Sequence, residues 1–216
     1  MIFILAIIGV ETSYGRITGT YRVLDALYTL AFYYPRREEF FRSELAHLFA
    51  LAREEKLDLA TLKGSYAGAM GYGQFMPSSY RGYAKDGDGD GRRDLLGSTR
   101  DAFASVANYF IGYGWHTGEP VFLPGTADAG AAPFKPDDFV AKYTLQDLAM
   151  RGYKPVDSFA PKLPVTLLTL EGAEGPEYWI GYHNFFVITR YNRSPMYAMA
   201  VFQLSQEIAA GQGVSP

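Results

Sequence analysis

The sequence predicts a mainly helical fold of the α+β class that contains a small antiparallel β-sheet. Several segments place apolar side chains every three to four residues, which is the period of an amphipathic helix. Residues 164–190 instead combine β-branched and aromatic residues with turn residues, which is typical of short strands. A length of 216 residues with 48% apolar residues allows one large domain, or one domain with a small insertion, around a real core.

The first half of the chain predicts a succession of helices. Residues 2–12 form a continuous apolar run, which we interpret as a buried helix. Residues 22–33 and 36–56 carry amphipathic patterns, and Pro35 breaks the run between them. Asp58 is a residue type that caps helices, so it predicts a short helix after it.

Three further helices are predicted from their first residues. Ser98 with Asp101, and Thr144 with Asp147, have the spacing of a capping box, in which side chains satisfy the first backbone N–H groups of a helix. The helix after Thr144 ends before Gly152, a residue type common just after a helix. After Pro195 the sequence MYAMAVFQLSQEIAA predicts a last helix.

The remaining segments predict loops and strands. Residues 64–77 are rich in glycine, so we expect a folded loop that approaches backbone or ligand closely. Residues 118–137 contain four prolines and little periodicity, which indicates a loop or linker. The segments PVTLLTL, EYWIGY and FFVITR predict the strands of the small sheet.

These changes from helical patterns to loop and strand patterns along the sequence predict the domain organisation. We expect a core made of residues 1–116 and 191–216, which includes a cation loop at 86–101, and a linker with a small β-containing subdomain at 117–190. The apolar stretch at residues 1–10 is too short to span a bilayer and lacks the features of a signal peptide. We expect an upstream sequence, and any export signal or lipid anchor would lie there.

Composition excludes several classes of function. A formal net charge of −3 provides no basic surface for nucleic acid. The absence of cysteine excludes disulfides and thiolate metal sites, and His47, His116 and His183 share no metal-ligand spacing. The chain contains no phosphate-binding loop, serine nucleophile elbow or zinc signature. An aromatic content of 16% suits either sugar binding or an ordinary core.

One carboxylate stands out as a candidate acid. Glu11 is the first acidic residue, and it follows directly on an apolar helix. Partial desolvation there would raise the pKa of its carboxyl and keep it protonated, as a general acid requires. The alternative is a helix-terminal glutamate without chemistry. Glycosidic cleavage usually takes two carboxylates, but Asp25 sits within an amphipathic helix, where we expect a structural contact.

A run of alternating aspartates predicts a binding site for a hard cation. Asp86, Asp88, Asp90 and Gly91 match positions one, three, five and six of an EF-hand loop. The backbone carbonyl of Arg92, and the side chains of Asp94 and Asp101, are further candidate ligands, because the twelfth position is a glycine rather than the usual bidentate glutamate. The alternative is a solvated acidic turn.

Six sequence motifs follow one another along the chain: IIGVETSYG (7–15), VLDALYTLAFYYPRREEFFRSEL (23–45), LKGSYAGAMGYGQFMPSSY (62–80), DGDGDGRRDL (86–95), SVANYFIGYGW (105–115) and YHNFFVITRYNRSPMYAMAV (182–201). In these motifs and their order the chain resembles the membrane-bound lytic transglycosylase B family of peptidoglycan-cleaving enzymes. The resemblance spans nearly the whole chain and is weakest at about 117–160.

The resemblance implies a lysozyme-like α fold with a groove for glycan strands. It implies cleavage of the β-1,4 bond between N-acetylmuramic acid and N-acetylglucosamine without water, which leaves a 1,6-anhydro end. In this reaction Glu11 would protonate the glycosidic oxygen and then deprotonate the muramic C6 hydroxyl. The 2-acetamido group of the substrate would support the cationic centre in place of a second carboxylate.

Other expectations follow from the same resemblance. Ser65, Gln74, Tyr191 and Asn192 would line the groove, and their hydroxyl and amide groups suit sugar recognition. Arg36 and Arg37 would meet peptide or lactyl carboxylates. Without the resemblance, these residues by themselves favour ordinary structural roles.

The resemblance also implies the setting of the protein. The cation loop at 86–101, here called the Asp loop after Asp86, Asp88 and Asp90, would hold structural calcium. Catalysis would need no cofactor. We expect a monomer that acts on peptidoglycan glycan strands in the periplasm or the outer-membrane-associated cell envelope, with membrane association only through an upstream anchor. Two alternatives stay open: a lysozyme-type muramidase that uses the same glutamate, and a non-catalytic glycan- or calcium-binding module.

Overall fold

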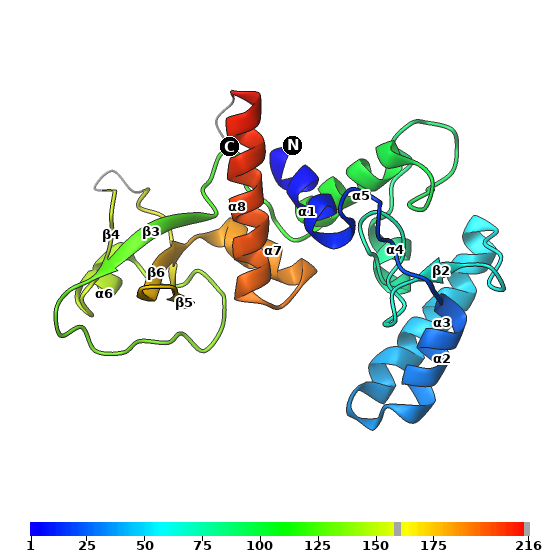
Figure 1. Ribbon diagram of the computed structural model, residues 1–216, viewed down its shortest axis with the longest axis horizontal. Coiled ribbons are helices and arrows are strands. Elements are labelled where there is room, and N and C mark those ends of the chain that lie inside the picture. The colour runs from blue at the N-terminus through cyan, green and yellow to red at the C-terminus, as the bar shows by residue number, and fades with distance from the viewer. Residues whose placement is uncertain (158–160, 214–216) are drawn as a thin grey trace. The chain divides into compact units, whose positions relative to one another are not determined.

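A computed structural model describes residues 1–157 and 161–213, and the chain divides into two compact units (Figure 1). The first unit comprises Met1–Tyr109 and Leu204–Pro216, and the second comprises Phe110–Gln203. The predicted division at 116/117 and 190/191 differs from these boundaries, and it stays a prediction; its last residues, 214–216, lie outside the described part. Within residues 1–157 and 161–213, every helix is too short or too polar to cross a bilayer.

The first unit is built mainly from helices. Its elements are α1 (Ile2–Thr12), β1 (Tyr21–Arg22), α2 (Val23–Tyr33), the 3-10 helix η1 (Pro35–Arg37), α3 (Glu38–Glu55), β2 (Lys63–Gly64), α4 (Pro77–Tyr83) and most of α5 (Thr99–Gly112). Strands β1 and β2 pair antiparallel, with Tyr21 opposite Gly64. Helices α2 and α3 lie side by side as a hairpin that η1 closes (Figure 1).

Apolar periodicity explains why these helices form where they do. Helix α1 carries no charged residue before its last turn, and its middle residues Ala6 and Ile7 are fully buried. Helix α3 buries one stripe at three- to four-residue spacing and exposes the opposite face; its buried residues are Phe41, Glu44, Leu45, Leu48 and Leu51.

The charged member of that buried stripe fixes the start of α4. The carboxylate of Glu44 is only 4% exposed, and it accepts hydrogen bonds from the backbone N–H of Ser78 at 2.9 Å and from the Ser78 hydroxyl at 2.6 Å. Pro77 begins the helix and has no N–H to satisfy. Glu44 therefore acts as the N-terminal cap of a helix that belongs to a different part of the chain.

The middle of α4 is held by a buried phenol. The Tyr80 hydroxyl donates to the carbonyl of Arg93 at 2.5 Å and accepts from the N–H of Leu95 at 3.1 Å. Burial raises the pKa of Tyr80 to about 12, so the phenol stays neutral and keeps its proton for the Arg93 carbonyl.

The second unit contains a four-stranded antiparallel sheet with the strand order β4-β3-β6-β5. Its elements are β3 (Phe122–Ala127), α6 (Leu145–Ala149), β4 (Tyr153–Pro155), β5 (Thr166–Gly172), β6 (Gly175–Gly181), α7 (His183–Tyr191) and the first half of α8 (Pro195–Gln212). One buried cluster of this unit joins α6 to the sheet and comprises Leu148, Tyr153, Val165, Leu167, Ile180 and Tyr182. The mainly helical α+β class is thus confirmed.

The segment between α5 and β3 depends on one buried amide. Asn184 in α7 is fully buried, and its side-chain oxygen accepts from the N–H of His116 at 2.9 Å. Its NH₂ group donates to the carbonyls of His116 and Glu119 at 2.8 and 2.9 Å. The two histidine rings nearby, His116 and His183, stack at 4.5 Å, which agrees with the structural role expected for them.

Three details of the sequence interpretation are wrong. The segment FFVITR lies in helix α7 and not in a strand, because Phe185, Ile188 and Thr189 are buried at helical spacing. The segment 118–137 includes strand β3. In this strand Pro124 is opposite Trp179 on β6, and it comes just before the residues 125–127 that pair with β4. Asp58 forms a turn with Ala60 and Thr61 and caps no helix.

Replacing Glu44 with alanine tests the cap on α4. The change leaves the partly buried Ser78 N–H without its acceptor, so we expect the free energy of unfolding to fall by about 1–3 kcal/mol. Urea denaturation measures this loss. Glu39→Ala, at an exposed position of α3, is the matched control and should change stability by less than about 0.5 kcal/mol; equal losses in the two variants would contradict the capping role.

Candidate functional site

Glu11 lies in the last turn of α1 and is followed by an unusual backbone turn. Its side chain is half-buried. Ser13, Tyr14 and Gly15 have φ values of 49°, 60° and 85°, so three successive residues adopt left-handed conformations. Such conformations cost about 1–3 kcal/mol each for residues other than glycine, and they persist only where the surroundings impose them.

The turn is held from within by hydrogen bonds to the end of the helix. The N–H groups of Ser13 and Tyr14 donate to the carbonyls of Gly9 and Ile8 at 2.9 and 3.3 Å. The bond from Ser13 to Gly9, with Ser13 in the left-handed conformation, is that of the αL type of helix ending. Glu11 therefore precedes a sharp, defined end of α1, and its backbone cannot continue as a regular helix.

Thr12 connects this turn to a distant segment. Its hydroxyl accepts from the N–H of Gly15 at 3.0 Å and lies 3.1 Å from the Ile8 carbonyl and 2.9 Å from the Tyr72 carbonyl. The side chain is only 1% exposed. Residue 12, next to the candidate acid, is thus bonded to residue 72, two positions before Gln74.

The glycine-rich segment is a folded loop, as the sequence predicts. Met70 and Phe75 exchange backbone hydrogen bonds, each at 2.9 Å, and close a tight loop between them. Gln74 sits in that loop with a φ of 50°. Its side-chain NH₂ group donates to the carbonyls of Thr18 at 3.1 Å and Gly71 at 3.0 Å, so this loop is also tied to the segment after Glu11.

Two glycines allow these segments to touch. A Cβ atom on Gly15 would lie 2.1 Å from the ring of Tyr72, and a Cβ atom on Gly19 would lie 2.1 Å from the backbone of Gly64. Only glycine permits such close approach, and both residues also have positive φ angles. The chain after Glu11 is therefore packed along the segment that carries Ser65 and Gln74.

Ser65 and Gln74 offer complementary chemistry in this arrangement. The Ser65 oxygen accepts from the N–H groups of Ala67 and Ala69 at 3.3 and 3.0 Å, which leaves its proton to be donated. The Gln74 NH₂ group is engaged with backbone carbonyls, which leaves the amide oxygen as an acceptor. A cleft of about 310 Å³ adjoins these carbonyls and is lined by Thr18, Leu57, Asp58, Thr61, Leu62, Lys63, Gly71 and Leu96.

The remaining predicted site residues belong to other parts of the chain. Tyr191 ends helix α7 in the second unit, where its ring meets Phe110 edge-on at 6.4 Å, and Asn192 is the exposed residue that follows. Arg36 and Arg37 are exposed in η1, and the guanidinium of Arg37 lies 4.2 Å from the centre of the Phe40 ring.

Asp25 has the structural contact that the sequence interpretation expected. Its carboxylate accepts two hydrogen bonds of 2.7 Å from the guanidinium of Arg22. This exposed pair lies at the start of α2, in the first turn, where a negative charge also favours the helix.

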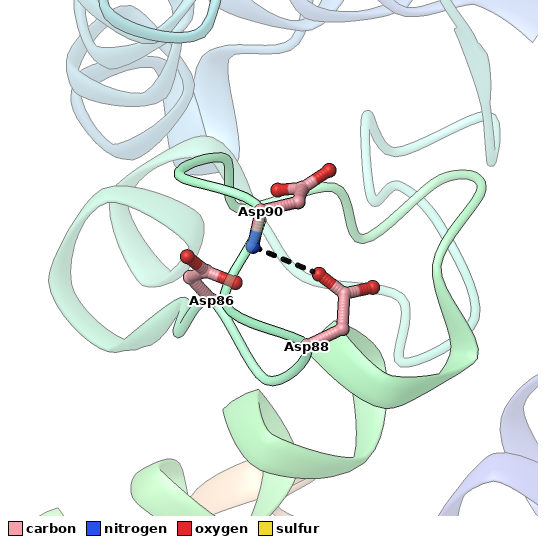
Figure 2. Close-up of side chains that lie close together, drawn as sticks. All are labelled: Asp86, Asp88 and Asp90. Carbon is pink, nitrogen blue, oxygen red and sulfur yellow. Dashed lines mark hydrogen bonds between the residues drawn. The ribbon is translucent and has the colours of Figure 1, made fainter.

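The structure brings three of the candidate cation ligands together. Carboxylate oxygens of Asp86, Asp88 and Asp90 lie within 4.8 Å of one another, as Figure 2 shows. Asp86 accepts the N–H groups of Gly91 and Gly89, and these backbone hydrogen bonds lower the pKa of its carboxyl. A charged, oxygen-only group of this kind suits a hard cation such as calcium.

The other candidate ligands have different surroundings. The carboxylate of Asp101 is 1% exposed and accepts the N–H groups of Gly87 at 2.8 Å and Asp94 at 2.6 Å, so it clamps the two sides of the loop. Asp94 accepts the N–H groups of Leu96 and Gly97. Ser98 caps α5 by accepting from Asp101 at 3.2 Å and donates to Asp88 at 2.9 Å. The predicted N-terminal cap is confirmed, but the Asp101 carboxylate bonds to the loop.

Sequence reasoning missed Thr12 and Tyr72. Threonine at the end of a helix and tyrosine in a glycine-rich loop are both ordinary, and their contact spans 60 positions along the chain. The only local signal is the glycine at position 15, which indicates a left-handed turn.

This fold is that of a transglycosylase family. Residues 2–206 match the family described as Transglycosylase SLT domain, and the chain belongs to that family. The membrane-bound lytic murein transglycosylase B of Escherichia coli K12 is 50% identical over 206 residues, which cover 95% of this chain. The chain spans 56% of the length of that relative.

Solved structures agree with this assignment. The catenated lytic transglycosylase SltB1 from Pseudomonas aeruginosa is 50% identical, with a TM-score of 0.89 over 97% of this chain and 69% of its own. The Escherichia coli lytic transglycosylase Slt35 in complex with calcium is 48% identical, with a TM-score of 0.88 over 97% of this chain and 66% of its own. The lysozyme-like fold implied by the sequence is thereby confirmed.

Replacing Gly15 with alanine tests the close packing behind Glu11. The new Cβ would meet the Tyr72 ring and would also strain a left-handed residue, so we expect unfolding to become easier by at least about 1–2 kcal/mol. Thermal unfolding measures this change. Gly82→Ala in α4 is the matched control, because nothing lies within 4 Å of its Cβ position, and it should leave stability unchanged or raise it by about 0.5–1 kcal/mol.

Proposed function

We propose that this chain is a lytic transglycosylase that cleaves the β-1,4 bond between N-acetylmuramic acid and N-acetylglucosamine and leaves 1,6-anhydromuramic ends. The observation that carries the proposal is the packing of the segment after Glu11 against the loop that bears Ser65 and Gln74, in a chain of the transglycosylase family. Peptidoglycan glycan strands are the proposed substrate and partner. In support, a related Pseudomonas aeruginosa enzyme, SltB3, 35% identical, has been solved with NAG-anhNAM-pentapeptide.

Glu11 is the proposed acid and base. Its carboxyl gives a proton to the glycosidic oxygen as the bond from that oxygen to muramic C1 breaks. The resulting carboxylate then takes the proton of the muramic C6 hydroxyl, and the oxygen of that hydroxyl forms the new bond to C1. One carboxyl group thus returns to its starting state, and no water is consumed.

The substrate supplies what a second carboxylate would otherwise provide. The positive charge that develops at C1 is next to the 2-acetamido group, whose carbonyl oxygen can stabilise it. A hydroxyl donor at Ser65 and an amide acceptor at Gln74 are suited to orient that acetamido group and the sugar hydroxyls. These two side chains are therefore proposed as substrate-binding residues.

Four further residues are proposed to bind substrate. Tyr191 and Asn192 offer a phenol and an amide, which suit the hydroxyl groups of a sugar. Arg36 and Arg37 are exposed cations, which suits the carboxylates of the lactyl group or the stem peptide. We also propose that the protein acts as a monomer in the periplasm or at the outer membrane, in line with the membrane-bound relative.

Replacing Glu11 with glutamine tests the catalytic assignment. The amide cannot give up a proton as an acid, so we expect turnover to fall at least about 1,000-fold while binding to glycan strands is retained. Mass spectrometry of digested peptidoglycan measures both the rate and the product. Anhydro ends from the unaltered chain support the proposal, whereas reducing muramic ends would indicate a hydrolase. Undiminished cleavage by the glutamine variant would remove Glu11 from the mechanism.

We propose that the Asp loop binds calcium as a structural ion and that catalysis uses no cofactor. Asp86, Asp88 and Asp90 supply the central carboxylates, with the Arg92 carbonyl, Asp94 and Asp101 as the further ligands. Each oxygen of Asp101 retains a lone pair beyond its bond to a backbone N–H. The Slt35 relative solved with calcium supports the choice of ion.

Removal of two of these carboxylates tests the calcium site. We expect the double variant Asp86→Asn, Asp88→Asn to lose at least tenfold in calcium affinity, since two of the clustered charges disappear. Calorimetric titration of chelator-treated protein measures the affinity, and the melting temperature with and without calcium measures the linked stability. Asp58→Asn, an acidic side chain outside the loop, is the control. Equal calcium binding by all three proteins would refute the assignment.

A further inference from the structure

Thr12 is a polar residue that is almost fully buried, and it lies next to the proposed catalytic residue Glu11. Among the described residues it is one of few polar side chains at 1% exposure or less. It directly follows Glu11, and its hydroxyl contacts three backbone groups: the Gly15 N–H and the carbonyls of Ile8 and Tyr72. The single proton of this hydroxyl serves one carbonyl at a time, so its removal costs the Gly15 N–H its acceptor and the two carbonyls their shared donor.

We propose that Thr12 is a positioning residue that sets the location of the Glu11 carboxyl relative to the loop carrying Gln74. This inference rests on the proposed function and deepens it. Thr12 cannot itself act on the substrate, because its single proton and its lone pairs are directed to backbone groups inside the fold. Its effect on the reaction therefore passes through Glu11.

The first part of the argument is the left-handed turn. Ser13 and Tyr14 are held at φ values of 49° and 60°, which the chain does not favour by itself. The bond from the Gly15 N–H to the Thr12 oxygen spans these two residues and closes the turn. Without it, the end of α1 can relax toward a more common helix ending, and Glu11 lies one residue before that end.

The second part is the link to the glycine-rich loop. The Thr12 hydroxyl lies 2.9 Å from the Tyr72 carbonyl, and the Gln74 NH₂ group donates to the Thr18 carbonyl at 3.1 Å. These two bonds join the same pair of segments, at 12–18 and 72–74, and they lie at opposite ends of the contact. The Tyr72 ring against Gly15 fills the space between them.

The third part is the precision that the chemistry demands. Glu11 must serve first the glycosidic oxygen and then the C6 hydroxyl, so its carboxyl has to stay within hydrogen-bond reach of both positions. A displacement of about 1 Å in a catalytic group can cost about 100-fold in rate. The side chain of Gln74 would move with its loop, so loss of the Thr12 hydroxyl separates two groups that act on one sugar.

Two substitutions at this position separate the hydroxyl from the rest of the side chain. Thr12→Val keeps the branched shape and removes the hydroxyl, whereas Thr12→Ser keeps the hydroxyl and removes the methyl group. We expect kcat to fall about 10- to 100-fold in the valine variant with less than about a threefold change in KM. The serine variant should retain kcat within about threefold of the unaltered chain.

The measurements are kinetics on peptidoglycan together with thermal melting, with every assay run at least about 10 °C below the melting temperature of the variant. Thr117→Val, at an exposed threonine, is the control for the substitution itself. Glycan binding by Thr12→Val in the Glu11→Gln background shows that the groove is still formed.

The outcomes distinguish the two proposals. Loss of turnover in Glu11→Gln with full turnover in Thr12→Val would overturn the positioning role and leave the proposed function intact. Full turnover in Glu11→Gln would overturn the proposed function first. A fall in kcat of the same size in the serine and valine variants would also overturn the positioning role, because the hydroxyl would then make no difference.

Discussion

The candidate site depends on one constraint: the chain must turn with three left-handed residues immediately after Glu11. Ser13 and Tyr14 carry side chains, so this conformation is unfavourable unless contacts outside the turn impose it. Those contacts come from the Thr12 hydroxyl and the Tyr72 ring. The position of the proposed acid is therefore a property of the folded unit rather than of helix α1 alone.

The glycines of the first unit follow from the same constraint. Gly15 and Gly19 are needed because the Tyr72 ring and the Gly64 backbone occupy the places of their Cβ atoms. Two short segments far apart in sequence thereby approach closely enough for backbone hydrogen bonds and side-chain amides to join them. The packing that stabilises the unit is also the packing that assembles the chemical groups, so the energetics and the site cannot be altered separately here.

The sequence predicted what depends on local pattern and missed what depends on distant contacts. The helix at 2–12 was predicted from a continuous apolar run and the helix at 22–33 from apolar periodicity, both to within one residue. The cap at Thr144 was predicted from its spacing with Asp147. The segment FFVITR was misassigned because β-branched residues suggested a strand, whereas burial on α7 follows a helical period.

Two further differences have tertiary causes. Strand β3 was hidden by its proline, which is tolerated because it lies where the pairing with β4 ends, and its carbonyl still accepts the N–H of Val156 at 2.9 Å. The roles of Thr12 and Tyr72 had no sequence signal, since the contact exists only after the glycine-rich loop has folded against α1. The Asp loop, by contrast, was predicted from spacing alone, and the structure clusters three of its carboxylates.

The other carboxylates of the first unit also bear on the proposed reaction, which uses a single catalytic carboxyl group. Glu44 caps helix α4, Asp101 clamps the Asp loop, and each carboxylate oxygen of the two residues accepts a hydrogen bond from an N–H or hydroxyl group of the fold. Asp25 is exposed and paired with Arg22. None of these three is disposed to act as a second catalytic carboxylate, because each is already engaged in holding the fold. In the proposed reaction the acetamido group of the substrate removes the need for such a carboxylate, so the single glutamate at position 11 would be sufficient.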